Sequence, residues 1–248
     1  MLENLNNENT VVVIGRGHSG TRLMSDTLKE SGYDVGSPLN VAGDLIPAES
    51  IYEACRIFGK FVDYKGKHEW DFTRAVEAKI PDGFKDQLTV YLKSVLESKS
   101  ELKGWKIPQS TLIYPWLVRL LPNIKYVFWI REPKDTILKM HGIDRLEKWN
   151  IPCKKYLFHS FNYRMRAVSW KYHYDIVNET PRPKNFLMIR FEDFVLNQDA
   201  CLQKLEKFLG RPVAKVHVIK SKVGMWKKNR WVKNYSFLKK PMLNLNYD

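Results

Sequence analysis

Three short segments of the chain combine glycines, hydroxyl groups and cationic side chains in the way that anion-binding sites do. The first, residues 15–22, reads Gly-Arg-Gly-His-Ser-Gly-Thr-Arg and directly follows the apolar run Val11–Ile14. Glycines let the backbone turn its N–H groups toward one point, and the N-terminus of a following helix adds positive potential. We therefore expect this loop to bind a phosphate-like group through Arg16, Gly17, His18, Ser19, Gly20, Thr21 and Arg22.

The second segment follows the apolar run Tyr126–Ile130, which ends at Arg131. Pro133 is predicted to begin a helix that includes residues 136–140 and carries Lys139 two turns along. Arginine offers forked donors and lysine a point charge, so Arg131 and Lys139 could hold one phosphate from two sides.

The third segment lies in a lysine-rich region, residues 215–240, that contains no acidic residue. Glycine and serine between lysines suit a loop that wraps around an anion, but the same composition is also typical of a solvated basic tail. The candidate ligands here are Lys220, Ser221, Lys222 and Trp226.

The first segment departs from the nucleotide P-loop pattern Gly-x-x-x-x-Gly-Lys-[Ser/Thr] at two decisive positions. Thr21 stands in place of the lysine, and Arg22 in place of the hydroxyl that binds magnesium. The strand that would supply a Walker B aspartate ends in Arg131 instead. A magnesium-dependent kinase or NTPase with degenerate motifs is therefore disfavoured, and we expect no metal at this site.

Apolar spacing predicts the elements that position these segments. Continuous apolar runs are typical of buried strands, and spacing of three to four residues is typical of helices. The predicted strands are Val11–Ile14, Tyr126–Ile130 and Phe186–Ile189; the predicted helices extend from about Thr21 to Gly32 and over Leu88–Leu96, Leu112–Leu121 and Ala200–Leu209. This alternation predicts a three-layer α/β/α fold like that of P-loop NTPases, with a central parallel sheet. Ligands bind such sheets beyond the carboxyl ends of the strands, which places the chemistry in the turns after Ile14, Ile130 and Ile189.

Length and composition agree with a single domain over residues 1–248. The chain carries 41 Lys and Arg against 27 Asp and Glu, a formal charge of +14, which calls for an anionic partner. Three scattered cysteines without a CxxC pair argue against a disulfide framework and a zinc site.

The N-terminus lacks signal-peptide features and no apolar run could span a bilayer, so we expect a cytoplasmic protein. Residues 1–9 are expected to be flexible.

Taken in order, the motifs resemble those of sulfotransferases that use 3′-phosphoadenosine 5′-phosphosulfate (PAPS). Residues 15–23 resemble the family's 5′-phosphosulfate loop, and residues 131–135 its Arg-x-Pro-x-Asp motif for the 3′-phosphate. Residues 220–227 resemble the segment that closes over the 3′-phosphate, and residues 190–194 the Tyr-Glu-Asp strand end. The resemblance extends from about residue 11 to 228. His18 replaces the loop's usual Arg or Lys, and Lys139 replaces a usual serine.

The resemblance implies metal-independent, in-line transfer of a sulfuryl group from PAPS to a hydroxyl acceptor such as a carbohydrate or glycolipid. Residues 39–103 would form an acceptor-binding insertion, and residues 215–248 a basic segment that closes on the nucleotide. The acceptor would be a small molecule or glycan, and an anionic or membrane-surface acceptor also fits the charge. No nucleic-acid partner is expected, and the sequence does not indicate an oligomeric state.

The resemblance also implies candidates for the catalytic residues. Lys106, in Gly104–Pro108, resembles the Lys-x-Pro turn of carbohydrate sulfotransferases, where a lysine could stabilise the sulfuryl group or the leaving oxygen. Glu53 resembles a glutamate of heparan-type enzymes and is the first candidate base, ahead of Glu49 one helical turn earlier and Asp44. His18 could act on the transferring group. Other candidates are His68, His141 and His159 as bases, and Trp226, Phe191 and Trp170 as adenine contacts.

Two other classes remain open on the sequence alone. A degenerate P-loop kinase would be indicated by strict magnesium dependence. A nucleic-acid-binding protein would account for the charge of +14 and the many aromatic residues, and would bind generic nucleic acid with steep salt dependence. The second class gives no reason for a glycine loop between a strand and a helix.

Overall fold

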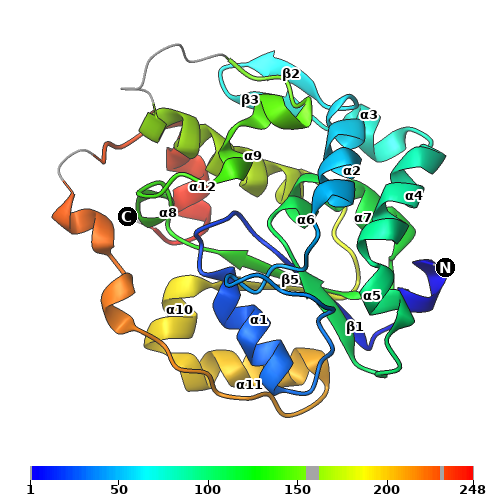
Figure 1. The fold of residues 1–248 in the computed structure, drawn as a ribbon. Helices are drawn as coiled ribbons and strands as arrows, with labels where there is room; N and C mark the ends of the chain where they lie inside the picture. The colour runs from blue at the N-terminus through cyan, green and yellow to red at the C-terminus, as the bar shows by residue number, and fades with distance from the viewer. Residues whose placement is uncertain (1, 155–161, 230–231, 248) are drawn as a thin grey trace.

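The computed structural model describes residues 2–154, 162–229 and 232–247. Its centre is a four-stranded parallel sheet in the order β4-β1-β5-β6 (Figure 1). The strands are β1 (Thr10–Ile14), β4 (Lys103–Lys106), β5 (Lys125–Ile130) and β6 (Phe186–Arg190). From β1 the chain passes to β4 on one side and then to β5 on the other. Ligands bind open α/β sheets where the strand order reverses in this way.

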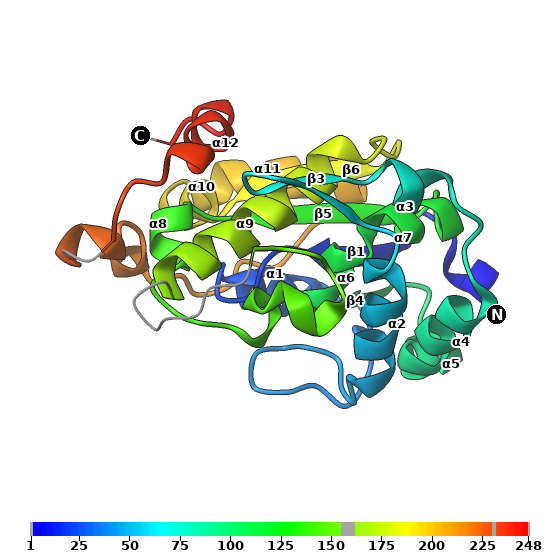
Figure 2. The ribbon, with the colours of Figure 1, turned by 90° about the horizontal axis from the view of Figure 1, so that it is seen from above.

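Alternate residues of β1 face opposite layers of helices, as the pleat of a strand requires. Val11 and Val13 pack in one apolar cluster, and Val12 and Ile14 in another. The first cluster is covered by α1 (Thr21–Glu30), α10 (Phe191–Leu196) and α11 (Gln198–Leu209). The second is covered by a larger group of helices: α2 (Glu49–Gly59), α6 (Gln109–Leu112), α7 (Tyr114–Leu120) and α9 (Asn162–Glu179). Figures 1 and 2 show these helices on the two faces, which confirms the three-layer fold.

The remaining elements lie outside these layers or at their ends. An antiparallel hairpin joins β2 (Asp63–Gly66) to β3 (Glu69–Asp71). The other helices are α3 (Thr73–Glu77), α4 (Asp82–Tyr91), α5 (Lys93–Glu97), α8 (Pro133–Thr136) and α12 (Lys239–Asn244). Short 3₁₀ helices are η1 (Leu2–Leu5), η2 (Gly142–Asp144), η3 (Leu146–Trp149), η5 (Lys220–Lys222), η6 (Met225–Lys228) and η7 (Ser236–Leu238). Leu5 of η1 is fully buried in the larger apolar cluster.

The three strands predicted from apolar runs are confirmed, whereas β4 was not predicted. Its sequence, Lys-Gly-Trp-Lys, has no apolar run, and it is a strand because its backbone pairs with β1. The helix predicted over residues 136–140 is wrong, because α8 ends at Thr136. The Arg166 guanidinium donates hydrogen bonds to the carbonyls of Ile137 and Leu138, at 2.9 and 3.0 Å. Lys139 therefore lies on an irregular stretch beyond α8.

Candidate active site

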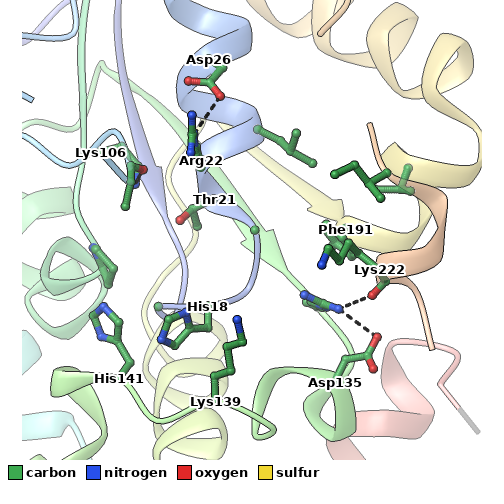
Figure 3. Close-up of a pocket in the computed structure, with 18 of the residues that line it drawn as sticks. His18, Thr21, Arg22, Asp26, Lys106, Asp135, Lys139, His141, Phe191 and Lys222 are labelled. Carbon is green, nitrogen blue, oxygen red and sulfur yellow. Dashed lines mark hydrogen bonds and ion pairs between the residues drawn. The ribbon is translucent and has the colours of Figure 1, made fainter. Parts of the chain in front are cut away.

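A cavity of about 670 Å³ opens at the carboxyl ends of β1, β4 and β5 (Figure 3). The three segments singled out for anion binding all contribute to its wall. Of the predicted site residues, those that line it are Gly17, His18, Gly20, Thr21, Arg22, Lys106, Arg131, Lys139 and Lys222. Those that do not line it are Arg16, Ser19, Glu49, Glu53, Lys220, Ser221 and Trp226.

The loop between β1 and α1 presents backbone N–H groups to the cavity. Among the described residues, no backbone carbonyl accepts a hydrogen bond from the N–H groups of Gly17, His18, Gly20, Thr21 and Arg22. Positive φ angles of 62° at His18 and 91° at Gly20 produce the turn. A Cβ atom on Gly17 would lie 2.4 Å from the His141 ring, so only glycine fits between this ring and the loop. Free N–H groups at a helix N-terminus form a ready-made anion site.

The Arg16 side chain supports this loop from behind and does not reach the cavity. Its guanidinium is buried and donates to Asp144 in η2, with 2.9 Å from Nε to Oδ1 and 2.7 Å from Nη2 to Oδ2. Nη1 donates to the carbonyls of Gly17 and Thr136. Arg16 thus connects the loop to α8 and η2, so any contribution to anion binding is indirect. Ser19 is buried as well, and its hydroxyl donates to the Arg16 carbonyl.

His18 belongs to this loop, and His141 lies beside it. The rings of His18 and His141 meet edge to face, with centroids 5.2 Å apart. Burial lowers the pKa of His18, and burial together with nearby Arg16 lowers the pKa of His141 to about 4. His141 Nδ1 accepts a hydrogen bond from the Ile143 N–H at 3.2 Å, which places the proton of the neutral ring on Nε2. His141 therefore offers a donor to the cavity rather than a base.

Arg131, from the second segment predicted to bind an anion, lies directly after β5. Its Nη2 donates to Asp135 Oδ2 at 3.1 Å and to the Lys222 carbonyl, and its guanidinium lies over the Phe191 ring at 4.2 Å from the centroid. Its Nε is buried and has no hydrogen-bond partner in the described chain. A buried donor without an acceptor is costly, and a bound anion would supply one. Lys139 is exposed on the same cavity (Figure 3).

Asp135 holds the lysine-rich segment over the cavity. Its carboxylate is fully buried and accepts hydrogen bonds from the N–H groups of Gly224 and Trp226, both at 2.8 Å. Lys222 and Met225 therefore line the cavity, whereas the Trp226 indole lies outside it. That indole donates to Glu132 Oε2 at 2.6 Å and stacks under the Lys134 ammonium.

Lys106, the last residue of β4, lies on the opposite wall. Its Nζ is 2.6 Å from Asp44 Oδ1 and 2.5 Å from the Ala42 carbonyl, and its side chain is 2% exposed. Burial lowers the pKa of Lys106, and the nearby Asp44 carboxylate opposes this shift. The segment 39–103 thus brings Ala42 and Asp44 to the cavity.

The other candidate bases lie away from the cavity. Glu53 is exposed on α2 and its Oε2 pairs with Arg56 at 2.9 Å, while Glu49 is exposed one turn earlier. His68 packs against the Phe237 ring at 4.6 Å between centroids and does not line the cavity. His159 lies outside the described residues.

Apolar side chains also line the cavity. Of the predicted adenine contacts only Phe191 does so, because Trp170 is buried against Tyr174 and donates to the Arg131 carbonyl. The other apolar residues on this wall were not predicted: Leu23 of α1, Val195 of α10, Ile219 just before η5 and Met225 of η6. No local motif joins them. Apolar side chains in the same cavity as two cationic segments suit a nucleobase.

Comparison with known proteins agrees with this arrangement. Residues 10–215 match the model of a family described as the sulfotransferase family. The chain belongs to that family. No curated protein matches its sequence.

Among solved structures, the sulfotransferase has the same fold as two bacterial domains. It is 14% identical to the sulfotransferase domain from the curacin biosynthetic pathway, with a TM-score of 0.58 and coverage of 96% of this chain and 97% of that one. It is 15% identical to the sulfotransferase domain of the Synechococcus PCC 7002 olefin synthase, with a TM-score of 0.59 and coverage of 98% and 96%. The sulfotransferase STF9 from Mycobacterium avium is 10% identical, with a TM-score of 0.51 and coverage of 100% and 79%.

No described helix is long and apolar enough to cross a membrane. In the part of the chain that the structure describes, no cluster of three or more His, Cys, Asp or Glu side chains could hold a metal ion.

Proposed function

We propose that this sulfotransferase moves the sulfuryl group of PAPS to a hydroxyl group of a small-molecule or glycan acceptor. The observation that carries the proposal is that two segments expected to bind anions, after the neighbouring strands β1 and β5, line one cavity together with apolar side chains. A nucleotide with a phosphate at each end needs this combination. The buried, unpaired Nε of Arg131 and the free N–H groups of residues 17–22 fit such a ligand.

Each end of the donor would meet different groups of the chain. The loop N–H groups and the Nε2–H of His141 would bind the 5′-phosphosulfate, and Arg131, Lys139 and Lys222 the 3′-phosphate. Lys106 would neutralise charge that grows on the transferring group, an effect that is strong where water is excluded. Since Lys106 is held by Asp44, it is positioned before any ligand binds.

The acceptor's proton would pass to a group on the Lys106 side of the cavity. Asp44 is the carboxylate that contacts Lys106 there, whereas Glu53 and Glu49 are exposed on α2. We therefore place Asp44, the third candidate from the sequence, first among the bases.

The assignment of the base predicts a contrast between two carboxamide variants. Asp44→Asn is expected to lower kcat by about 100-fold or more, the usual contribution of a positioned base. Glu53→Gln is expected to leave kcat close to the parental value, because its carboxylate contacts Arg56 on the surface. Steady-state kinetics at saturating PAPS measure both. If kcat fell in Glu53→Gln and stayed at the parental value in Asp44→Asn, Glu53 would again be the first candidate for the base.

Donor binding predicts a specific thermal shift. The product nucleotide, 3′-phosphoadenosine 5′-phosphate (PAP), at 100 times its Kd should add about 2.7 kcal/mol to the free energy of unfolding. For a chain of this length that corresponds to about 5–10 °C in Tm. ATP with magnesium should give a much smaller shift. A clear shift with Mg·ATP and none with PAP would support the kinase alternative instead.

The contacts of Asp135 predict a role in nucleotide affinity. A carboxamide has one acceptor oxygen where a carboxylate has two, so Asp135→Asn turns an N–H donor toward the N–H of Gly224 or Trp226. Losing a hydrogen bond to a charged group costs about 1.5–3 kcal/mol, so we expect PAP to bind about 10- to 100-fold more weakly, with kcat at saturating PAPS little changed. Calorimetric titration with PAP measures the Kd. Asp199→Asn, at an exposed pair with Lys215, is the control; equal Kd values for both variants would contradict the role.

A further inference from the structure

A second cavity lies on the other side of α8 from the candidate active site. Its volume is about 340 Å³, within the range of small-molecule sites. Lys134 and Ile137 line this cavity, whereas Asp135 and Leu138 line the first. The C-terminal segment 233–247 forms the rest of the wall, and Figures 1 and 2 show its helix α12 beside α8.

The wall of this second cavity is mainly apolar. Leu238 and Tyr247 are buried in it, and Met242 is partly buried. Leu243 also lines it but is 62% exposed, so it lies at the rim rather than in the core. A concave apolar surface of this size favours the burial of a short hydrocarbon chain.

The charged residues on the wall are all cations. Lys134, Lys233 and Lys239 line the cavity, and no carboxylate does so among the described residues. Lys233 and Lys239 are exposed, so their ammonium groups are available at the rim. An anionic group at the rim would be attracted to them.

We propose that this cavity binds a small amphiphile with one anionic head group, a carboxylate or a sulfate ester, on an alkyl chain. The chain lies against Leu238 and Met242, and the head pairs with the rim lysines. The site is separate from the donor cavity and does not depend on the proposed transfer reaction.

Binding is tested by calorimetric titration with dodecanoate and with dodecyl sulfate, each below its micelle-forming concentration. The expected result is saturable binding of one molecule per chain, unchanged by saturating PAP and several-fold weaker for neutral dodecanol. The two anions distinguish a carboxylate ligand from a sulfate-ester ligand, and tighter binding of either one supports the proposal. Displacement by PAP would place the amphiphile in the donor cavity and overturn it.

Two matched pairs of variants locate the site. Leu243→Asp and Lys239→Glu put negative charge at the rim and should weaken dodecanoate binding by about 10-fold or more. Leu196→Asp, at an exposed leucine of α10, and Lys240→Glu, next to Lys239 but off the cavity wall, should bind like the parent. All four changes are at exposed side chains, and their Tm values verify folding. Equal affinity in all four, no saturable binding to the parent, or binding only to anionic vesicles would each overturn the proposal.

Discussion

Lys106→Ala is expected to lower kcat by about 100- to 1,000-fold, the effect of removing one donor that stabilises charge in a transition state. The Lys106 side chain is 2% exposed and its ammonium group is held between Asp44 and the Ala42 carbonyl, so alanine leaves no cation at this position on the cavity wall. Turnover at saturating PAPS measures the loss. PAP affinity should change far less, because we propose that Arg131 and the loop after β1 supply the contacts to its two phosphates.

The controls for Lys106 separate chemistry from folding. Lys103→Ala, on the same strand but off the cavity wall, should keep the parental kcat. Burial lowers the pKa of Lys106, so parental activity should fall as the pH rises through that pKa and the ammonium group loses its proton. Lys106→Arg remains charged and should move this loss to higher pH. A well-folded Lys106→Ala with kcat within about threefold of the parent would contradict the role.

Arg131→Ala is expected to weaken PAP binding by at least about 30-fold, because losing a buried charged hydrogen-bonding group costs about 2–5 kcal/mol. The change removes the unpaired Nε donor, the stacking on Phe191 and the bond to the Lys222 carbonyl. Calorimetric titration with PAP measures the Kd. The effect on kcat at saturating PAPS should be much smaller, since Arg131 lies across the cavity from Lys106.

Two variants show what Arg131 contributes. Arg131→Lys keeps the positive charge but loses the forked N–H donors of the guanidinium and its planar stacking on Phe191. Its Kd for PAP should therefore lie between those of the parent and Arg131→Ala. Arg74→Ala, which removes a surface pair with Asp63, should leave the Kd unchanged. If Arg131→Ala bound PAP as tightly as the parent, the 3′-phosphate would have to bind elsewhere.

Local patterns in the sequence were sufficient for the main layers of the fold. The apolar runs that became β1 and β5 are buried within a parallel sheet, and buried parallel strands need continuous apolar sequence. The run that became β6 lies at the edge of the sheet and is only partly buried. The glycines of residues 15–20 identified the turn after β1, since few other residues allow such a close approach. Strand β4 escaped prediction, because its sequence has no apolar run and only the pairing of its backbone with β1 makes it a strand.

The roles of individual charges depended on contacts between distant parts of the chain. In the sequence Arg16 looks like a phosphate ligand. In the structure its guanidinium pairs with the Asp144 carboxylate, 128 positions away. Asp44 looked less suitable than Glu53, but a loop brings it to Lys106, 62 positions away. By itself the sequence determined the order of the strands along the chain, the anion-binding loop and the family resemblance, all of which depend on neighbouring residues. Only the tertiary structure decided which cations face the cavity, because a buried charge is committed to whichever partner the fold places beside it.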